Sequence, residues 1–381
     1  MKIAIVVMGG LHPGGEEHVV PSWLALFERL AKTHTIHAFV LKHLPAAQTY
    51  RLRGFTVHDL GRPSGPLGFN RWAQEKALRE ALDHHGPFDL IHGFWADPAG
   101  QLAARAGKRL GIPSIVTCDS GEFISLPKIN YGSQRTRSGR RAVREACALA
   151  TRVHVCTKFM AALAGAQGVS TTIIPLTSVT SQAATIKSAF ERRRTTGFRI
   201  VQVGSLSRLK NQRLLIDALS IVRERVDAHL DLVGEDTLGG QLQQHAATIG
   251  LADHVTFHGF LPQARVLEVL GVADLYVQSS LYEAAGVAVL EAAASGVATV
   301  GTLAGYVADW SPTKAMAVGD AIPESLADAI LTLHDDADRR RSMAALARTF
   351  SIAHDATWAA AKFDALYRTM QPPVTPTAAR R

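Results

Sequence analysis

One stretch indicates the fold most clearly: Tyr282-Glu283-Ala-Ala-Gly286-Val287-Ala-Val-Leu-Glu291-Ala-Ala-Ala-Ser-Gly296. It places two glutamates, one on a turn and one on the helix that follows. An apolar run over 273–279, typical of a strand, precedes it. In a doubly wound α/β domain, ligands bind outside the carboxyl ends of the strands, where this turn would lie. Carboxylates there can accept hydrogen bonds from sugar or ribose hydroxyls, and small residues let a ligand approach the backbone. The alternative is a helix whose first-turn acids only complement its dipole.

Length and cysteine usage bound the class of protein. The chain has 381 residues, more than the roughly 250 to 300 at which single cores stop growing, so two domains are expected. Cys118, Cys147 and Cys156 are an odd number without paired or metal-like spacing, which favours a reducing compartment. The apolar run 3–8 is too short for a signal peptide, and no later run reaches membrane-spanning length. We therefore expect a cytoplasmic protein.

The charge balance favours anionic ligands. The net charge is +8 and the pI is about 9.6, which suits phosphates, acidic glycans or lipid headgroups. Nucleic acid is not expected as a partner, because zinc spacing, an aromatic RNA-binding signature and a base-reading helix are all missing. A basic stretch could attract a lipid phosphate or an anionic glycan, which would allow a peripheral contact at the inner face of the membrane, or it could be a solvated helix face. It comprises Lys128, Arg135, Arg137, Arg140, Arg141 and Arg144.

Short runs rich in Val and Ile alternate with longer helical patterns, which predicts parallel sheets covered by helices. Strands are expected in the first half near 2–7, 34–40, 55–60, 88–93, 114–117, 152–156 and 172–175. Helices are expected there over 19–32, 71–84 and 99–110. In the second half strands are expected near 199–203, 229–233, 255–257, 274–278 and 297–300.

A polar, irregular segment separates the halves and indicates a linker. The predicted organisation is a first Rossmann-like domain over 1–176, the linker 177–197, a second Rossmann-like domain over 198–352, a C-terminal helix over 353–370 that packs back towards the first domain, and a disordered tail over 371–381.

A second glycine turn opens the second domain. Gly204 and Ser205 follow the strand Val201-Gln-Val203, and Arg208 and Lys210 come next. A glycine turn that feeds a helix offers unpaired N–H groups and a positive dipole end, and Lys210 adds a full charge, so this segment suits a diphosphate.

With these motifs the chain resembles the retaining GT-B glycosyltransferases of family 4, also called group 1, over nearly its whole length and most densely over 201–305. The resemblance implies an α/β fold with two Rossmann-like domains whose parallel sheets face an interdomain cleft. It also implies a nucleoside-diphosphate sugar as co-substrate, held mainly by the second domain, with the acceptor docking on the first. No cofactor or metal ion is expected, because the family generally binds none.

The resemblance assigns donor-side roles. Glu283 would contact the transferred sugar, Glu291 the ribose, and Lys210 the diphosphate. The remaining donor-side residues implied by the resemblance are Gly14, Gly15, Gly204, Ser205, Arg208, Gly234, Phe260, Gly286 and Val287. Ser205 departs from the family, which usually has an arginine there, and Arg208 could substitute.

On the acceptor side, Asp119 aligns where the family commonly has a histidine, and it could accept a hydrogen bond from a hydroxyl nucleophile or the donor sugar. A capping or turn role for Asp119 is the alternative. His12 and His92 lie at predicted strand-to-helix turns, with Trp95 close after His92, and all three are candidates for the acceptor side of the cleft. Trp95 could stack on a sugar ring or simply pack.

The implied reaction moves a hexose-type sugar from a nucleoside diphosphate to a hydroxyl acceptor, on a glycan, a lipid-linked molecule or a small molecule, with retention and without a metal ion. Asp119, Lys210 and Glu283 would carry the chemistry. Asp336-Ala-Asp338 has a metal-like spacing but is interpreted as a helix cap. Two alternatives remain open at this point: a non-catalytic GT-B protein that binds a nucleotide or glycan or serves as a partner subunit, and a sugar-nucleotide epimerase.

Overall fold

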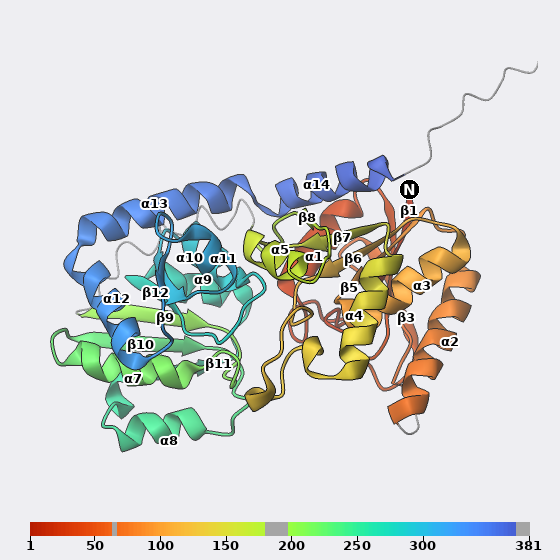
Figure 1. The fold of residues 1–381 in the computed structure, drawn as a ribbon. Helices are drawn as coiled ribbons and strands as arrows, with labels where there is room; N and C mark the ends of the chain where they lie inside the picture. The colour runs from red at the N-terminus through yellow and green to blue at the C-terminus, as the bar shows by residue number, and fades with distance from the viewer. Residues whose placement is uncertain (63–66, 180–196, 371–381) are drawn as a thin grey trace, which may run out of the picture.

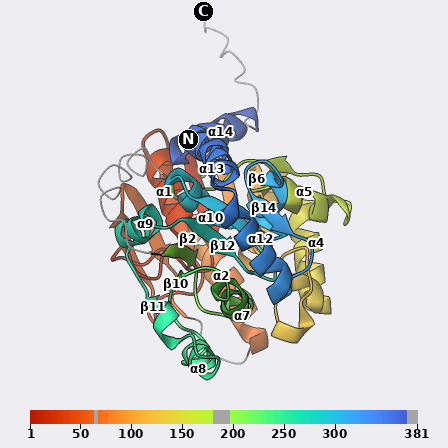
Figure 2. The same cartoon turned by 90° about the vertical axis from the view of Figure 1, so that its left-hand side faces the viewer.

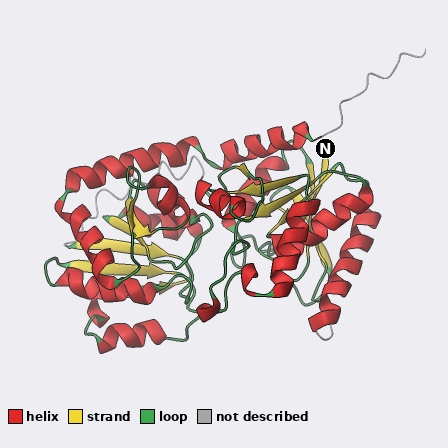
Figure 3. Ribbon diagram, in the orientation of Figure 1, coloured by secondary structure: helices red, strands yellow, loops and turns green. Residues whose placement is uncertain are grey.

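The computed structural model describes residues 1–62, 67–179 and 197–370, which form two lobes, each built on its own β-sheet (Figure 1). Helices flank both sheets (Figure 3). The predicted linker 177–197 lies mostly outside the described residues, and the predicted tail 371–381 lies wholly outside them. The fold is α/β with two mainly parallel sheets, as predicted.

The first lobe contains an eight-stranded sheet with the order β3-β4-β2-β1-β5-β6-β7-β8. Its strands are β1 Lys2–Val7, β2 Thr35–Val40, β3 Gln48–Leu52, β4 Phe55–Asp59, β5 Leu90–Phe94, β6 Ser114–Cys118, β7 Arg152–Val155 and β8 Thr172–Ile173. Pairing is parallel except between β3 and β4, which is antiparallel. The sequence did not predict β3, because it is a mostly exposed edge strand with Gln, Thr and Arg in place of an apolar run.

The helices of the first lobe explain why its central strands are buried throughout. They are α1 Pro21–Leu30, α2 Leu67–His85, the π-helical turn η1 Ala96–Gly100, α3 Gln101–Leu110, the short 3₁₀ turns η2 Pro127–Ile129 and η3 Ser133–Arg135, α4 Arg137–Leu149 and α5 Lys158–Gly165. All residues of β5 and β6 are buried, as expected for parallel strands covered on both faces.

The second lobe contains a six-stranded sheet with the order β11-β10-β9-β12-β13-β14. Its strands, all parallel, are β9 Phe198–Val203, β10 Ala228–Val233, β11 Val255–Gly259, β12 Leu275–Gln278, β13 Ala298–Thr302 and β14 Met316–Val318. The order reverses between β9 and β12. A doubly wound sheet binds its ligands at this point, outside the carboxyl ends of those strands.

The helices that follow β9 in the sequence include two, α13 and α14, that run back along the molecule (Figure 1). The set is α7 Gln212–Arg223, α8 Gln241–Thr248, the 3₁₀ turn η4 Ala252–His254, α9 Gln263–Gly271, α10 Val287–Ala294, α11 Gly305–Trp310, α12 Pro323–Asp335, α13 Ala337–Ala353 and α14 Ala356–Thr369. Asp336 caps α13, since its side chain accepts a hydrogen bond from the Arg339 N–H at 2.8 Å. This is the capping role expected from the sequence.

Helix α14 belongs to the first lobe in space. It packs along α1, and together α13 and α14 run along one side of the molecule in both views (Figures 1 and 2). Its side chains join the first lobe through hydrogen bonds between His34 and Asp364 at 2.8 Å and between Arg29 and Thr357 at 3.1 Å. Across the described part of the chain, every helix is too short or too polar to cross a membrane.

Candidate active site

Two glycine turns meet at the carboxyl ends of β9 and β10. Gly204 has φ +146°, and a Cβ there would lie 3.1 Å from Cε of Lys210. Gly234 has φ +148°, and its Cβ would lie 2.2 Å from the Gly204 carbonyl oxygen. Because both positions lie in a backbone region that other residues rarely adopt, only glycine lets the two loops and the Lys210 side chain pack this closely.

Lys210 and Glu283 form an ion pair at the point where β9 and β12 diverge. Lys210 Nζ lies 2.5 Å from Glu283 Oε1, and Ser280 donates to the same oxygen at 2.6 Å. The Lys210 backbone carbonyl accepts a hydrogen bond from Ser279 at 2.8 Å. The side chains are 26% and 12% exposed, respectively, so the pair is partly shielded but reachable. We call Lys210, Ser280 and Glu283 the donor cluster.

Gly286 begins α10 next to this cluster. It has φ +78°, and a Cβ would lie 2.5 Å from Oε1 of Gln278 on β12. Val287 is the first residue of the helix, and no side chain caps this end. The first N–H groups of an uncapped helix favour an anion. The donor-side role of Gly286 and Val287 remains a prediction.

Glu291 lies further along α10 and is buried. Its Oε1 accepts hydrogen bonds from Ser178 at 2.5 Å and from Gln263 at 3.2 Å. Burial raises the pKa of the Glu291 carboxyl, although these hydrogen bonds oppose the shift. Ser178 follows β8 of the first lobe, so Glu291 links the lobes through one of its oxygens. The expected contact with a ribose remains a prediction.

Three further donor-side candidates are exposed. Ser205 and Arg208 lie on the surface of the loop between β9 and α7. Phe260 follows β11 and is 49% exposed. These positions permit contact with a ligand, but the structure does not bring Arg208 or Phe260 into the donor cluster.

In the first lobe, Asp119 follows β6 and is hydrogen-bonded to a tryptophan. Trp23 of α1 donates its indole N–H to Asp119 Oδ2 at 3.2 Å, while Asp119 Oδ1 is buried and has no hydrogen-bond partner among the described residues. The rings of Trp23 and Trp95 lie 4.9 Å apart. Trp95 is therefore packed against Trp23 and remains partly exposed, so its two predicted roles are compatible.

Asp119 and Glu122 are a pair of buried carboxyls whose pKa values are both raised. Burial, reinforced by the nearby Glu122, raises the pKa of Asp119 to about 8. Burial also raises the pKa of Glu122 to about 7, although Glu122 accepts hydrogen bonds from the backbone N–H groups of Ser120 at 2.8 Å and Ala96 at 3.3 Å. Perturbed carboxyls in a loop after a strand are typical of functional sites. We call residues 119–123 the acceptor loop.

Tyr282 connects the donor cluster to the acceptor loop. This buried residue precedes Glu283, and its hydroxyl donates to the Ser120 carbonyl at 2.8 Å. A second hydrogen bond between the lobes runs from the Thr157 hydroxyl to the Ala284 carbonyl at 2.7 Å. Asp309 accepts from the backbone N–H of Lys158 at 2.7 Å. The segment after β12 is therefore fixed against the first lobe on both sides of Glu283.

The glycine loop after β1 lies in the first lobe. The Gly14 N–H donates to Nδ1 of His12 at 3.2 Å, and Gly15, with φ +70°, closes the turn through its N–H to the His12 carbonyl at 2.9 Å. The His12 ring also lies 5.7 Å from that of His43. His12 is partly exposed, as a cleft residue must be.

His92 was predicted on the acceptor side, and this prediction is wrong. The residue is fully buried on β5, its Nδ1 lies 2.8 Å from the Tyr367 hydroxyl, and its Nε2 lies 2.7 Å from the Thr117 hydroxyl. Burial holds the pKa of His92 well below its usual range. Both ring nitrogens are occupied inside the core, so His92 is a structural residue.

One group of described residues has the proximity needed to hold a metal ion, and it lies away from the donor cluster. The ligand atoms of His37, His58 and His85 are within 4.8 Å of one another. They come from β2, β4 and α2, and His37 Nδ1 and His58 Nε2 already share a hydrogen bond of 2.9 Å.

Sequence reasoning missed four contributors: Trp23, Glu122, Thr157 and Ser280. Glu122 could have been found from the sequence, because it stands three residues after Asp119 in the same glycine-containing turn, so the two carboxyls are close in sequence. Trp23 could not, since its partner Asp119 is 96 positions away. Ser280 was hidden in an ordinary small-residue run.

Comparisons with known protein families cover both lobes. The family model described as "Glycosyl transferases group 1" matches residues 184–350, and the model "Glycosyl transferase 4-like domain" matches residues 19–177.

Curated relatives show moderate identity. The chain is 25% identical over 311 residues to putative glycosyltransferase EpsF of Bacillus subtilis, covering 78% of each chain. It is 26% identical over 334 residues to 2-deoxystreptamine glucosyltransferase of Streptomyces kanamyceticus, covering 80% of this chain and 84% of that one. A match to mannosylfructose-phosphate synthase of Agrobacterium fabrum, 34% identical over 140 residues, spans only 34% of this chain and 30% of the relative.

Solved structures share the fold at low identity. Sucrose-phosphate synthase from Thermosynechococcus elongatus superposes with a TM-score of 0.79 at 18% identity, covering 97% of this chain and 98% of that one. HepE of Anabaena, in complex with UDP and glucose, superposes with a TM-score of 0.72 at 19% identity, covering 97% and 100%. These matches identify the two-lobed architecture as GT-B.

Proposed function

Because the chain is a GT-B glycosyltransferase of group 1 that uses a nucleotide sugar, we propose that it transfers a hexose-type sugar to a hydroxyl acceptor with retention at the anomeric carbon. The observation that carries this proposal is the ion pair between Lys210 Nζ and Glu283 Oε1, 2.5 Å apart at the switch point between β9 and β12. A cation and a carboxylate there match the two ends of a sugar diphosphate.

The two charged residues of the donor cluster would bind different parts of the donor. Lys210 would bind the diphosphate, and the uncapped start of α10 would add backbone N–H groups from Gly286 and Val287. Glu283, released from Lys210, would accept hydrogen bonds from the sugar hydroxyls. The same positive groups would stabilise the charge that develops on the leaving nucleoside diphosphate, so the proposed reaction needs no metal ion.

In the transfer step, the bond between the anomeric carbon and the phosphate oxygen breaks. The acceptor oxygen forms its new bond on the same face of the sugar, and its proton passes to the departing phosphate. Asp119 would orient the acceptor hydroxyl through Oδ1, the buried oxygen that has no hydrogen-bond partner among the described residues. The alternative of a non-catalytic binding protein makes no use of this oxygen.

A thermal-shift panel of UDP, GDP, ADP and their sugars tests the donor site. One base should raise the melting temperature of the wild type, because a ligand that binds only the folded state stabilises it. Lys210→Ala should lose most of that shift, and Arg213→Ala, which removes an exposed arginine on α7, should keep it.

Product analysis then tests the reaction. NMR of the product should show the anomeric configuration of the donor, and turnover should persist in a chelator. Binding without turnover of any donor, by transfer or by hydrolysis, would favour the non-catalytic alternative. An inverted anomer would overturn retention, and loss of activity in the chelator would overturn metal independence.

A further inference from the structure

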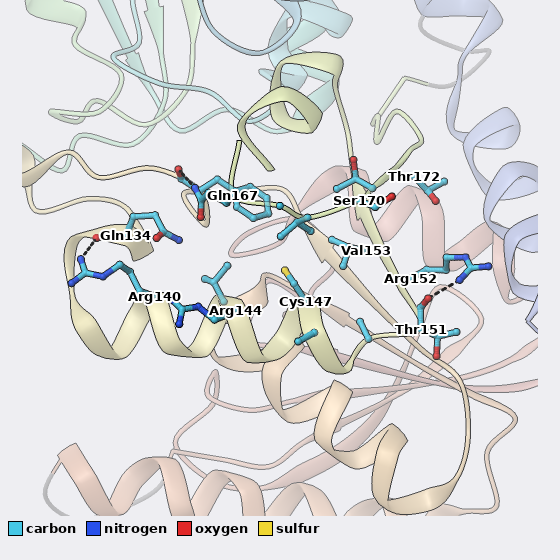
Figure 4. Close-up of a pocket in the computed structure, with 17 residues that line it drawn as sticks. Gln134, Arg140, Arg144, Cys147, Thr151, Arg152, Val153, Gln167, Ser170 and Thr172 are labelled. Atoms are coloured by element: carbon cyan, nitrogen blue, oxygen red, sulfur yellow. Dashed lines mark hydrogen bonds between the residues drawn. The ribbon is translucent and has the colours of Figure 1, made fainter. Parts of the chain in front are cut away.

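A cavity of about 790 Å³ opens on the first lobe between α4 and the segment that joins α5 to β8 (Figure 4). Its volume falls within the range of about 300 to 1,000 Å³ that small-molecule sites occupy. Val153 of β7 and Phe123 of the acceptor loop are among the residues that line it. Among the described residues that line it, none belongs to the donor cluster, so it is a separate feature of the molecule.

The charge of the cavity is one-sided. Arg140, Arg144 and Arg152 line it, and its described lining contains no aspartate or glutamate. Arg140 and Arg144 lie one turn apart on α4, and Arg152 lies at the other end, beyond α4 (Figure 4). Glu145, the acid nearest to them in sequence, is engaged by Arg105 at 2.6 Å. The cavity therefore favours an anion.

The hydrogen bonds of Arg140 and Arg152 leave their charge intact. Arg140 donates to the Gln134 carbonyl at 2.6 Å and Arg152 donates to the Thr151 carbonyl at 2.8 Å. A neutral carbonyl positions a guanidinium without neutralising it, and guanidinium groups bind phosphate strongly.

The other polar groups of the cavity suit a hydroxyl-rich ligand. Hydroxyls and amides can each donate and accept hydrogen bonds, which complements a polyol better than an apolar tail. These lining side chains are Gln134, Thr151, Gln167, Ser170, Thr171 and Thr172.

Two of these side chains also hold the acceptor loop. Gln134 donates to the Glu122 carbonyl at 2.6 Å, and Gln167 donates to the Phe123 carbonyl at 2.8 Å. A ligand that contacts either amide will therefore affect the hydrogen bonds that hold the loop carrying Asp119.

We propose that this cavity binds a phosphate ester of a hydroxyl-rich molecule, and that its occupancy is transmitted to the acceptor loop through Gln134 and Gln167. The phosphate lies against Arg140 and Arg144, and the hydroxyls face the polar wall. A soluble sugar phosphate and a lipid headgroup share this chemistry. The binding step does not depend on the function proposed above, so the two can fail separately.

Cys147 makes the binding step testable. It lines the cavity and is partly exposed, whereas Cys118 and Cys156 are buried. Alkylation of the native protein should therefore report on the cavity at one thiol, identified by mass spectrometry. The test uses a Lys210→Ala background, which weakens the donor site, and compares inorganic phosphate and a hexose phosphate with chloride at equal ionic strength.

Phosphate and hexose phosphate should slow alkylation of Cys147 several-fold. Arg144→Gln should weaken the protecting affinity on the order of tenfold, because a charge-assisted hydrogen bond is lost. Arg141→Gln is the matched control, since Arg141 is exposed on the same helix and does not line the cavity. Equal weakening by both variants would show a general surface charge and overturn the site.

Vesicles distinguish the two ligand sources. Protection by the soluble hexose phosphate identifies a soluble ester, whereas protection only by vesicles containing a phosphoinositide identifies a headgroup. Absence of protection by phosphate, hexose phosphate and vesicles overturns the proposal.

Hydrogen exchange tests the transmission. The ligand that protects Cys147 should slow amide exchange over residues 119–123 in the wild type. The double variant Gln134→Ala/Gln167→Ala should keep most of the Cys147 protection and lose the effect on exchange. Unchanged exchange in the wild type would overturn the coupling.

Discussion

The donor cluster and the acceptor loop both hold carboxyl groups, but the neighbours of these carboxyls differ in charge. Glu283 has a cation 2.5 Å away and a hydroxyl donor at 2.6 Å. Asp119 has a neutral indole N–H at 3.2 Å and a second buried carboxyl, Glu122, whose charge helps raise its pKa to about 8.

In the function proposed above, this contrast suits the donor half of the transfer to the second lobe and the acceptor half to the first. A carboxylate paired with a lysine can exchange that partner when an anionic ligand binds the lysine. A buried carboxyl beside another carboxyl has a raised pKa, so it can exchange a proton with a bound hydroxyl group near neutral pH.

The largest effect is expected at Lys210. Lys210→Ala should lower kcat/KM about 10²- to 10³-fold, the usual loss when one group that stabilises transition-state charge is removed. Steady-state kinetics with the donor identified by thermal shift measures it, with Arg213→Ala as the control. If Lys210 only neutralised Glu283, the double variant Lys210→Met/Glu283→Gln would regain activity, which we do not expect.

Next comes the backbone beneath the donor cluster. Gly234→Ala should destabilise the protein by about 3 kcal/mol or more, since φ is +148° and the new Cβ would meet the Gly204 carbonyl at 2.2 Å. Gly239→Ala is the matched control, because Gly239 also has a positive φ of +63° but open space around its Cβ position. It should cost only about 1 kcal/mol. Urea unfolding compares the two, and equal losses would contradict the close packing of the turns.

The acceptor loop should make stability depend on pH. The pKa values of about 8 for Asp119 and about 7 for Glu122 exceed the values of roughly 4 in an unfolded chain. The unfolded chain therefore releases these protons first, and stability should fall as pH rises from about 4 to about 8. The slope is about 1.4 kcal/mol per pH unit for each carboxyl.

Asp119→Asn should flatten this slope, as measured by urea unfolding between pH 5 and 8, which lies between the unfolded and folded pKa values of these carboxyls. Asp253→Asn, a change at an exposed residue of η4, should leave it unchanged. A wild type that gains stability over the same range relative to Asp119→Asn would refute the assignment.

The smallest effect concerns the connection between the two regions. Tyr282→Phe removes the hydrogen bond to Ser120 and should cost about 1 kcal/mol. Tyr367→Phe removes the bond to His92 and should cost a similar amount. Only Tyr282→Phe should raise the KM for the acceptor, by several-fold, because only it touches the acceptor loop. Equal KM values in the two variants would separate Tyr282 from acceptor binding.

Much of the fold follows from the sequence because its strands are short apolar runs. The strand predicted over 2–7 matches β1, and the runs near β9 and β12 locate the switch point. The edge strands β3 and β14 were missed. Polar β3 pairs at the margin of its sheet, and β14 has only three residues.

The site could be predicted only where it depends on local motifs. Lys210 and Glu283 each follow a strand with a small-residue turn, so each was recognised, but their pairing across 73 positions was not. His92 was misjudged because a fully buried strand gives no alternation to show which side chains point inward. The raised pKa values of Asp119 and Glu122 depend on burial by distant segments, which no local pattern reveals.

Helix α14 has a consequence for how the protein is made. Phe363 and Tyr367 are fully buried, and Tyr367 closes over His92 from 275 positions away. A ribosome finishes every strand of the first lobe long before it releases this helix. The nascent first lobe must therefore wait, with its α14-binding surface uncovered, until the entire second lobe has been synthesised. We expect chaperone occupancy during translation to persist on that surface until α14 emerges.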